Sequence, residues 1–246
     1  MVPDVVPLKA FAGGRLFGER LGDGPPAVIG LHGWGRNRAD LSQALVGLDA
    51  LVVDLPGFGA SPPPAEAWGA AGYAQAVIPV LDECPGPAVV LGHSFGGRVA
   101  VCLAAQRPDR VRALVLTGVP LLRRVVRRPP FRYRALRSLH HAGLLSDQRM
   151  ERARSRHGSR DYRAASGVMR DVLVRTVNES YEEQLSRLGC PVELVWGEND
   201  ADAPLEMARR AAELIPDARL TVVPGGDHFT ALRDPALRAA LERHLP

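Results

Sequence analysis

The chain has 246 residues, enough for one domain with a large core, and its 46 % hydrophobic and 24 % charged content is ordinary for a globular protein of net charge +4. Three widely spaced cysteines argue against a disulfide framework and show no metal-ligand pattern. No apolar run of about 18 residues is present that could span a bilayer. Because the N-terminus also lacks a basic, apolar leader, we expect a cytoplasmic protein.

The chain begins with the pattern of an antiparallel hairpin over residues 11–21, with Gly13-Gly14 at its turn. Beyond it, short apolar runs alternate with segments of helical pattern. This alternation predicts an α/β fold with a largely parallel sheet, covered by helices on both faces. The predicted strands are residues 27–31, 51–54, 88–91, 113–116, 192–196 and 220–223, and the predicted helices are residues 38–48, 67–83, 96–106, 204–215 and 234–244.

One long segment, from Val119 to about Val177, contains no predicted strand. The flanking strands need only a short crossover, so this segment is an insertion. It follows a strand that ends at Thr117, and ligands of such sheets bind beyond the carboxyl ends of the strands. We therefore predict a core of residues 1–120 and 177–246, and a helical lid of residues 121–176 that covers the site.

The most informative motif is Gly92-His93-Ser94-Phe95-Gly96-Gly97, which stands between a predicted strand and a predicted helix. This is the context in which G-x-S-x-G forms a sharp turn that displays a nucleophilic serine. Gly92 and Gly96 remove the Cβ atoms that would clash, so that Ser94 can adopt a strained backbone. The motif alone also fits a turn that serves only packing, so the prediction depends on partners for Ser94.

A base and an acid follow the last two predicted strands. His228 lies directly after the last strand, where it can reach Ser94, take its proton and later protonate a leaving group. Asp200 follows the penultimate strand and is our candidate for the acid that orients the imidazole, with Asp202 in reserve. Asp202 better suits a helix N-cap before Pro204. The order Ser94, Asp200, His228 is that of a hydrolase triad.

An oxyanion site needs two backbone N–H donors. One is expected from Phe95, at the N-terminus of the helix after the nucleophile, where the helix dipole also favours negative charge. The other is expected from the loop after the first parallel strand, where Trp34 is the best candidate. His32 in the same loop is predicted to hold the loop through hydrogen bonds.

Five motifs resemble the α/β-hydrolase superfamily, in the order that the family shows. The resemblance covers residues 1–120 and 177–246, and it implies an eight-stranded, mostly parallel sheet and a triad of Ser94, His228 and Asp200. The serine at position 94 disfavours the members that use an aspartate nucleophile. The motifs are His32-Gly33-Trp34-Gly35, Asp54-Leu55-Pro56-Gly57-Phe58-Gly59-Ala60-Ser61, Gly92 to Gly97, Trp196-Gly197-Glu198-Asn199-Asp200 and Gly226-Asp227-His228-Phe229.

The predicted lid is strongly basic. Residues 121–163 contain 13 Arg and three acidic residues, a net charge of +10, so the rest of the chain carries −6. A solvated helical face explains this pattern, and so does a surface for an anionic membrane, substrate or partner. Few aromatic residues interleave with the arginines, which disfavours nucleic acid. The candidate docking residues are Arg123, Arg124, Arg127, Arg128, Arg152, Arg154 and Arg156.

The loop from Leu31 to Gly35 and the short basic lid are similar to those of the pimeloyl-[acyl-carrier protein] methyl ester esterases. This second resemblance implies an acidic carrier protein as the partner of the lid arginines. The sequence departs from that group at His93 and Phe95, where Trp and Leu are usual, so the carrier-protein assignment stays an alternative.

We predict a serine hydrolase that cleaves carboxylic esters of small to medium acyl chains, without cofactor or metal. Hydrolysis of carbon–carbon bonds in ring-fission products uses the same triad and stays open, as does a non-catalytic ligand-binding member of the fold. Candidate residues for an apolar acyl pocket, or simply for packing of the lid, are Leu121, Leu122, Val125, Val126, Phe131, Leu139, Leu144 and Met169.

Overall fold

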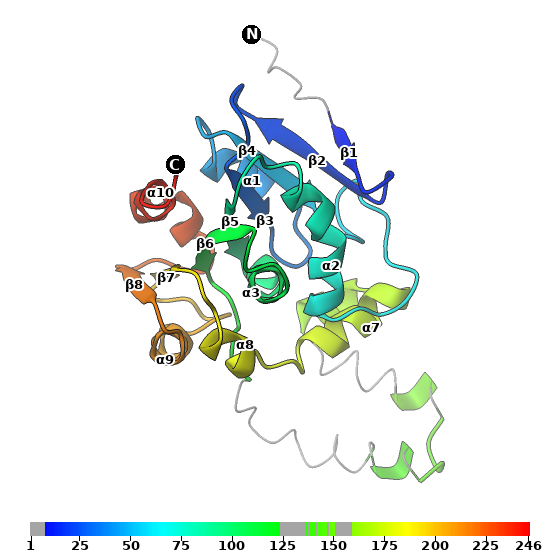
Figure 1. Cartoon of the computed structure of the whole chain (residues 1–246). Coiled ribbons are helices and arrows are strands. Elements are labelled where there is room, and N and C mark those ends of the chain that lie inside the picture. Colours follow the sequence, from blue (N-terminus) through cyan, green and yellow to red (C-terminus); the bar gives the residue numbers. More distant parts are fainter. Residues whose placement is uncertain (1–7, 124–135, 137, 141, 147, 151–158) are drawn as a thin grey trace.

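The computed structural model describes residues 8–123, 136, 138–140, 142–146, 148–150 and 159–246. These residues form one eight-stranded sheet in the order β1-β2-β4-β3-β5-β6-β7-β8 (Figure 1). The strands β3 to β8 run parallel, whereas β2 pairs antiparallel with both of its neighbours, β1 and β4. The strands are β1 (Lys9–Phe11), β2 (Leu16–Leu21), β3 (Val28–Leu31), β4 (Ala50–Asp54), β5 (Ala88–His93), β6 (Val111–Thr117), β7 (Val192–Gly197) and β8 (Ala218–Val223).

Helices cover both faces of this sheet, and a separate apolar cluster fills the space under each layer (Figure 1). Successive side chains of a strand point to opposite faces. In β5, Val90 therefore joins one cluster, whereas Val89 and Leu91 join the other. The first cluster includes residues of α2 (Ala70–Leu81), α3 (Phe95–Gln106), α7 (Gly167–Thr176), α8 (Glu182–Ser186) and α9 (Leu205–Leu214), and the second includes residues of α1 (Ala39–Ala44), the 3-10 helix η1 (Thr230–Arg233) and α10 (Pro235–Glu242).

The fold predicted from the sequence is confirmed, including the leading hairpin, whose turn at Gly13-Gly14 has positive φ at both glycines. Element ends differ from the prediction where local geometry intervenes. The helix predicted to reach residue 48 ends at Ala44, and Gly47 (φ 75°) has a conformation that does not continue a right-handed helix. The five-residue α8 was not predicted, because it is too short to show a helical period.

The predicted insertion contains no strand among the described residues, and its described helices include α6 (Arg160–Ala164) and α7. The two ends of the insertion meet at one buried side chain. Arg98 of α3 donates from Nε to the carbonyl of Pro120 (3.0 Å) and from Nη1 to the carbonyl of Thr176 (2.7 Å). Tyr181 N–H also donates to the Leu121 carbonyl (3.3 Å). Both ends of the insertion are thus tied to the helix that begins next to Ser94.

Most residues of the predicted lid that we singled out lie outside the described residues, namely Arg124, Arg127, Arg128, Arg152, Arg154, Arg156, Val125, Val126 and Phe131. Leu121 and Leu122 are buried in the main core, and Leu139 and Leu144 are exposed. The lid itself stays a prediction. Within the described part of the chain, no helix is both long and apolar enough to cross a bilayer.

Candidate active site

Ser94 lies between β5 and α3 in a conformation that side chains rarely adopt. Its φ of 50° and ψ of −115° place it in a region that favours glycine, so the turn is strained. A Cβ atom at Gly92 would lie 2.5 Å from Cα of Gly97, and one at Gly96 would overlap the carbonyl of Leu31. The two glycines therefore allow the close approach of strand, turn and helix that holds Ser94 half-buried at the sheet edge.

His228 and Asp200 meet at the same edge of the sheet, in the loops after β8 and β7. His228 Nδ1 and Asp200 Oδ2 are 2.8 Å apart, and the two residues are only 9 % and 4 % exposed. The other Asp200 oxygen, Oδ1, accepts hydrogen bonds from the N–H groups of Asp202 (2.8 Å) and Ala203 (2.7 Å). These bonds fix the carboxylate toward the imidazole. Asp200, and not the exposed Asp202, is thus the carboxylate that contacts His228.

Gly118, directly after β6, lies against this pair. It has a positive φ of 60°, and a Cβ atom there would lie 2.8 Å from His228 Cε1 and 3.2 Å from Asp200 Oδ2. A side chain at this position would push the imidazole off the carboxylate. The sequence alone does not indicate this role of Gly118. Its one signal there is a glycine that closely follows a predicted strand.

Ser94 and His228 are connected through His93, the residue before the serine. The Nε2 atom of His93 is 3.1 Å from the main-chain carbonyl oxygen of His228, and the two imidazole centroids are 4.8 Å apart. Among the described contacts, no hydrogen bond joins the hydroxyl of Ser94 to His228. The structure therefore brings the three predicted residues to one edge of the sheet, with a direct bond only between Asp200 and His228.

The loop after β3 lies next to Ser94, as a Cβ atom at Gly33 would come within 3.3 Å of the serine Cβ. His32 holds this loop as predicted. Its Nε2 accepts from the N–H of Leu55 (2.9 Å), so its Nδ1–H donates to the carbonyl of Gly33 (2.7 Å). Burial lowers the pKa of His32 and keeps it in the neutral form that this pattern needs.

The backbone N–H groups of Trp34 and Phe95 are the predicted donors to an oxyanion. Among the described contacts, neither group donates to a protein acceptor. Their side chains belong to an aromatic cluster, in which Trp34 packs at 5.0 Å on Phe58 and at 5.4 Å on Phe95. Tyr73 packs on Phe95 at 4.9 Å and places its hydroxyl 3.9 Å from the sulfur of Met169 in α7. The insertion thus contacts the apolar wall beside Ser94.

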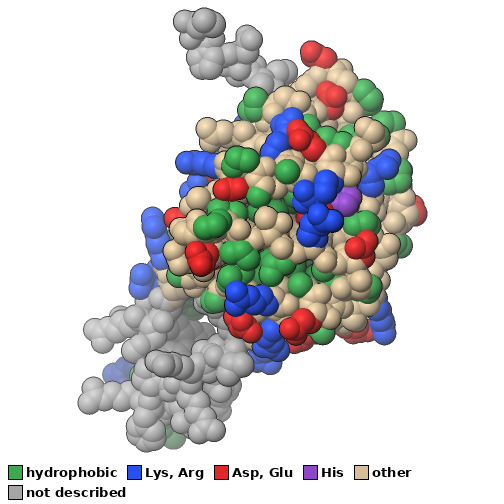
Figure 2. All heavy atoms as spheres, turned by 90° about the vertical axis from the view of Figure 1, so that its left-hand side faces the viewer, with side chains coloured by type: hydrophobic (Ala, Val, Ile, Leu, Met, Phe, Trp, Pro, Cys, Tyr) green, Lys and Arg blue, Asp and Glu red, His purple; other side chains and the backbone are tan. Residues whose placement is uncertain are grey.

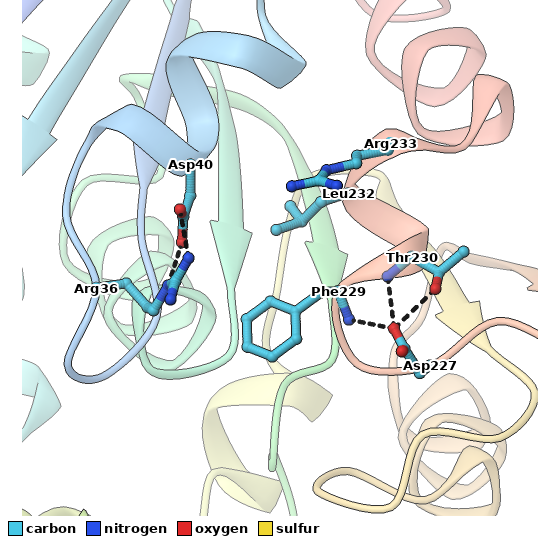
Figure 3. Close-up of a pocket in the computed structure, with 7 residues that line it drawn as sticks. All are labelled: Arg36, Asp40, Asp227, Phe229, Thr230, Leu232 and Arg233. Carbon is cyan, nitrogen blue, oxygen red and sulfur yellow. Dashed lines mark hydrogen bonds and ion pairs between the residues drawn. The ribbon is translucent and has the colours of Figure 1, made fainter.

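A cavity of about 340 Å³ lies between the loops that follow β3 and β8. Figure 3 shows Arg36 and Phe229 facing each other from these two loops, with the guanidinium carbon 5.3 Å from the ring centroid. Arg36 is held by a bidentate ion pair with Asp40, and Asp227 accepts hydrogen bonds from Phe229 N–H and from Thr230. Each of the loops that carry Trp34 and His228 is therefore held by its own hydrogen bonds, and the two loops contact each other through Arg36 and Phe229.

The described residues contain no group of three His, Cys, Asp or Glu side chains that could hold a metal ion. The candidate site is formed by the strained serine, the His228–Asp200 pair and the loop after β3. Sequence reasoning gave no role to His93, Arg98 or Gly118, which surround these groups.

Three comparisons with known proteins place the chain. The model of the alpha/beta hydrolase family matches residues 28–241. A pimeloyl-[acyl-carrier protein] methyl ester esterase of Chromobacterium violaceum is 32 % identical, over 94 % of this chain and 98 % of that protein.

Solved structures agree in fold. A thermophilic esterase matches with a TM-score of 0.70 and 24 % identity, over 96 % of this chain and 97 % of that one. A meta-cleavage product hydrolase from Pseudomonas fluorescens matches with a TM-score of 0.68 and 22 % identity, over 96 % and 97 % of the two chains. The match of the family model and the relative from Chromobacterium violaceum together show that this chain belongs to the alpha/beta hydrolase family.

Proposed function

We propose that this protein is a serine hydrolase that cleaves carboxylic esters through an acyl-enzyme intermediate. The observation that carries the proposal is the His228–Asp200 hydrogen bond at the sheet edge where Ser94 is held in its strained turn. Esterases among the relatives that align over nearly the whole chain support the same class of reaction. In this assignment Ser94 is the nucleophile, His228 the general base and acid, and Asp200 the group that orients it.

The reaction has two halves. Ser94 Oγ attacks the ester carbonyl carbon while His228 Nε2 takes its proton, and Asp200 stabilises the imidazolium through Nδ1–H. The N–H groups of Trp34 and Phe95 stabilise the oxyanion, where the loss of one donor typically costs about 2.7–4 kcal/mol. The C–O bond to the alcohol then breaks and His228 protonates the alcohol. Water, deprotonated by His228, then attacks the acyl carbon. The bond from this carbon to Ser94 Oγ breaks, His228 returns the proton to Oγ, and the acid is released.

The absence of a Ser94–His228 hydrogen bond among the described contacts agrees with this assignment. Catalytic hydrogen bonds in unliganded enzymes are often long or poorly aligned, and they tighten only when substrate is bound. The main-chain carbonyl and the Nδ1 atom of His228 are already held by His93 and Asp200.

An ester attached to an acidic protein is a second, more specific candidate for the natural substrate. The name of the Chromobacterium violaceum relative gives such a substrate for that protein, and residues 121–163 of this chain carry a net charge of +10. The rest of the chain differs from residues 121–163 in charge, with a net charge of −6. On the face that bears β8 and α10, Figure 2 shows basic and acidic side chains interspersed. An acidic carrier protein would therefore be attracted to the insertion and not to that face.

Steady-state turnover of two substrate sets tests the proposal. We expect hydrolysis of p-nitrophenyl esters in a series from acetyl to dodecanoyl, and hydrolysis of a pimeloyl methyl ester attached to acyl-carrier protein. Replacement of Arg123, Arg124, Arg127 and Arg128 by Gln should lower turnover of the carrier-linked ester roughly 10-fold and leave the p-nitrophenyl series unchanged.

The matched control makes the same replacement by Gln at four exposed arginines of the core, Arg187, Arg209, Arg210 and Arg219. It should change the turnover of neither substrate set. No turnover of any ester by the folded protein would refute the esterase assignment. Equal effects of both quadruple variants on the carrier-linked ester would refute only the docking role of the insertion.

A further inference from the structure

His93, the residue before the proposed nucleophile, is a buried histidine with a specific polar contact. It is 1 % exposed, and its Nε2 lies 3.1 Å from the main-chain carbonyl oxygen of His228. A carbonyl oxygen can only accept, so this nitrogen carries the proton and donates. The bond spans 135 positions of the chain and joins the serine turn to the loop of the proposed base.

The other ring nitrogen of His93, Nδ1, faces the loop that carries Trp34. It has no hydrogen-bond partner within the described residues, and a Cβ atom at Gly33 would lie 2.9 Å from it. Protonation of Nδ1 would leave a buried cation without an acceptor. Burial, and next the nearby charge of His228, lower the pKa of His93 to about 4, so the ring stays neutral as a single donor.

Two other rings pack against the ring of His93 at tilted angles. It packs at 4.8 Å on the imidazole of His228 and at 5.5 Å on the ring of Phe229. The side chain therefore stands between the serine turn, the loop after β3 and the loop after β8. A buried histidine that only fills space needs no such bond, whereas this ring directs its one N–H at the backbone of His228.

We propose that His93 is a positioning residue that fixes the backbone of His228, and so holds its imidazole within reach of Ser94. This inference rests on the proposed function, because it assigns His93 a task in the same reaction. Asp200 fixes one ring nitrogen of His228. Asp227 holds the residues that follow, through the N–H groups of Phe229 and Thr230. Neither bond constrains the main-chain carbonyl of His228, whose described partner is His93.

Two amide variants separate the hydrogen bond from the volume of the side chain. In His93→Gln the amide nitrogen has about the reach of Nε2, so the donor to the His228 carbonyl is kept. In His93→Asn the amide is one carbon shorter and cannot reach this carbonyl. Since a displacement of about 1 Å in a catalytic group can cost on the order of 10²-fold in rate, we expect kcat to fall roughly 30- to 100-fold in His93→Asn, with KM nearly unchanged. We expect less than about a 5-fold fall in His93→Gln.

The measurements are kcat and KM on a p-nitrophenyl ester, with thermal unfolding to confirm that both variants fold. Equal kcat values in the two variants, whether high or low, would overturn the assignment, because the donor would then make no difference. A rise of KM with unchanged kcat in His93→Asn would overturn it as well. A wild-type protein without esterase activity would instead contradict the proposed function.

A second readout does not depend on activity. The proton on His228 Nδ1, bonded to Asp200, is expected to give a proton NMR signal shifted far downfield of the amide region. Fixing of the loop by His93 predicts that this signal stays sharp in His93→Gln and is broadened or lost in His93→Asn. A sharp, unshifted signal in both variants would overturn the positioning role even where one of them is catalytically impaired.

Discussion

Ser94→Ala should abolish ester hydrolysis, with a loss of at least about 10⁴-fold in kcat. The proposed mechanism forms and breaks a bond at Ser94 Oγ, and His228 cannot replace that bond by activating water in the same geometry. Loss of the nucleophile in a serine hydrolase leaves only the stabilisation from the oxyanion donors and from substrate binding. The measurement is turnover of a p-nitrophenyl ester by the purified, folded variant.

Stability provides the control for this variant, because the backbone strain at position 94 does not depend on the hydroxyl. Alanine keeps the same φ of 50°, so Ser94→Ala should unfold within a few degrees of the wild type. Ser94→Gly should also be inactive, yet more stable than Ser94→Ala by about 1–2 kcal/mol, since glycine adopts this conformation without strain. Retention of turnover in either variant would remove Ser94 from the mechanism.

Arg98→Leu should lower the free energy of unfolding by about 2–4 kcal/mol. Arg98 is 8 % exposed, and its guanidinium donates to the carbonyls of Pro120 and Thr176 at the two ends of the insertion. Leucine matches much of the apolar stem but leaves both carbonyls without their donor, in a region where water has little access. For a domain of this size the expected fall in the unfolding temperature is roughly 5–15 °C, measured by thermal denaturation.

The matched control is Arg98→Lys, which keeps the charge and one donor group but cannot bond both carbonyls in the same geometry. It should lie between the wild type and Arg98→Leu. Burial lowers the pKa of Arg98, because desolvation disfavours the charged guanidinium. An Arg98→Leu variant as stable as the wild type would contradict this account, because the two carbonyls would then lose their donor at no cost in stability.

The sheet and the candidate site were predictable because their signals are local. Each strand of the parallel sheet is a short apolar run, and the order of Ser94, Asp200 and His228 fixes which strand end carries each group. A parallel sheet brings all its carboxyl ends to one edge, so residues far apart in sequence can be assigned to one site.

The supporting residues were not predictable, because their roles depend on contacts between distant segments. In the sequence, Arg98 looks like a solvent-exposed position of a helix. Its burial is explained by the main-chain carbonyls of Pro120 and Thr176, which both accept hydrogen bonds from it. His93 is a variable position of the serine motif, and its partner is a main-chain carbonyl that has no signature in sequence. Gly118 matters because His228 packs on it.

Labelling with a fluorophosphonate tests the central claim most directly. The serine oxygen attacks phosphorus and fluoride leaves, so the probe remains on the residue that acts as nucleophile. We predict one adduct per chain, found by peptide mass spectrometry on Ser94, absent in Ser94→Ala and formed far more slowly in His228→Ala. An adduct on another residue, or a folded wild-type protein that stays unlabelled, would contradict the account.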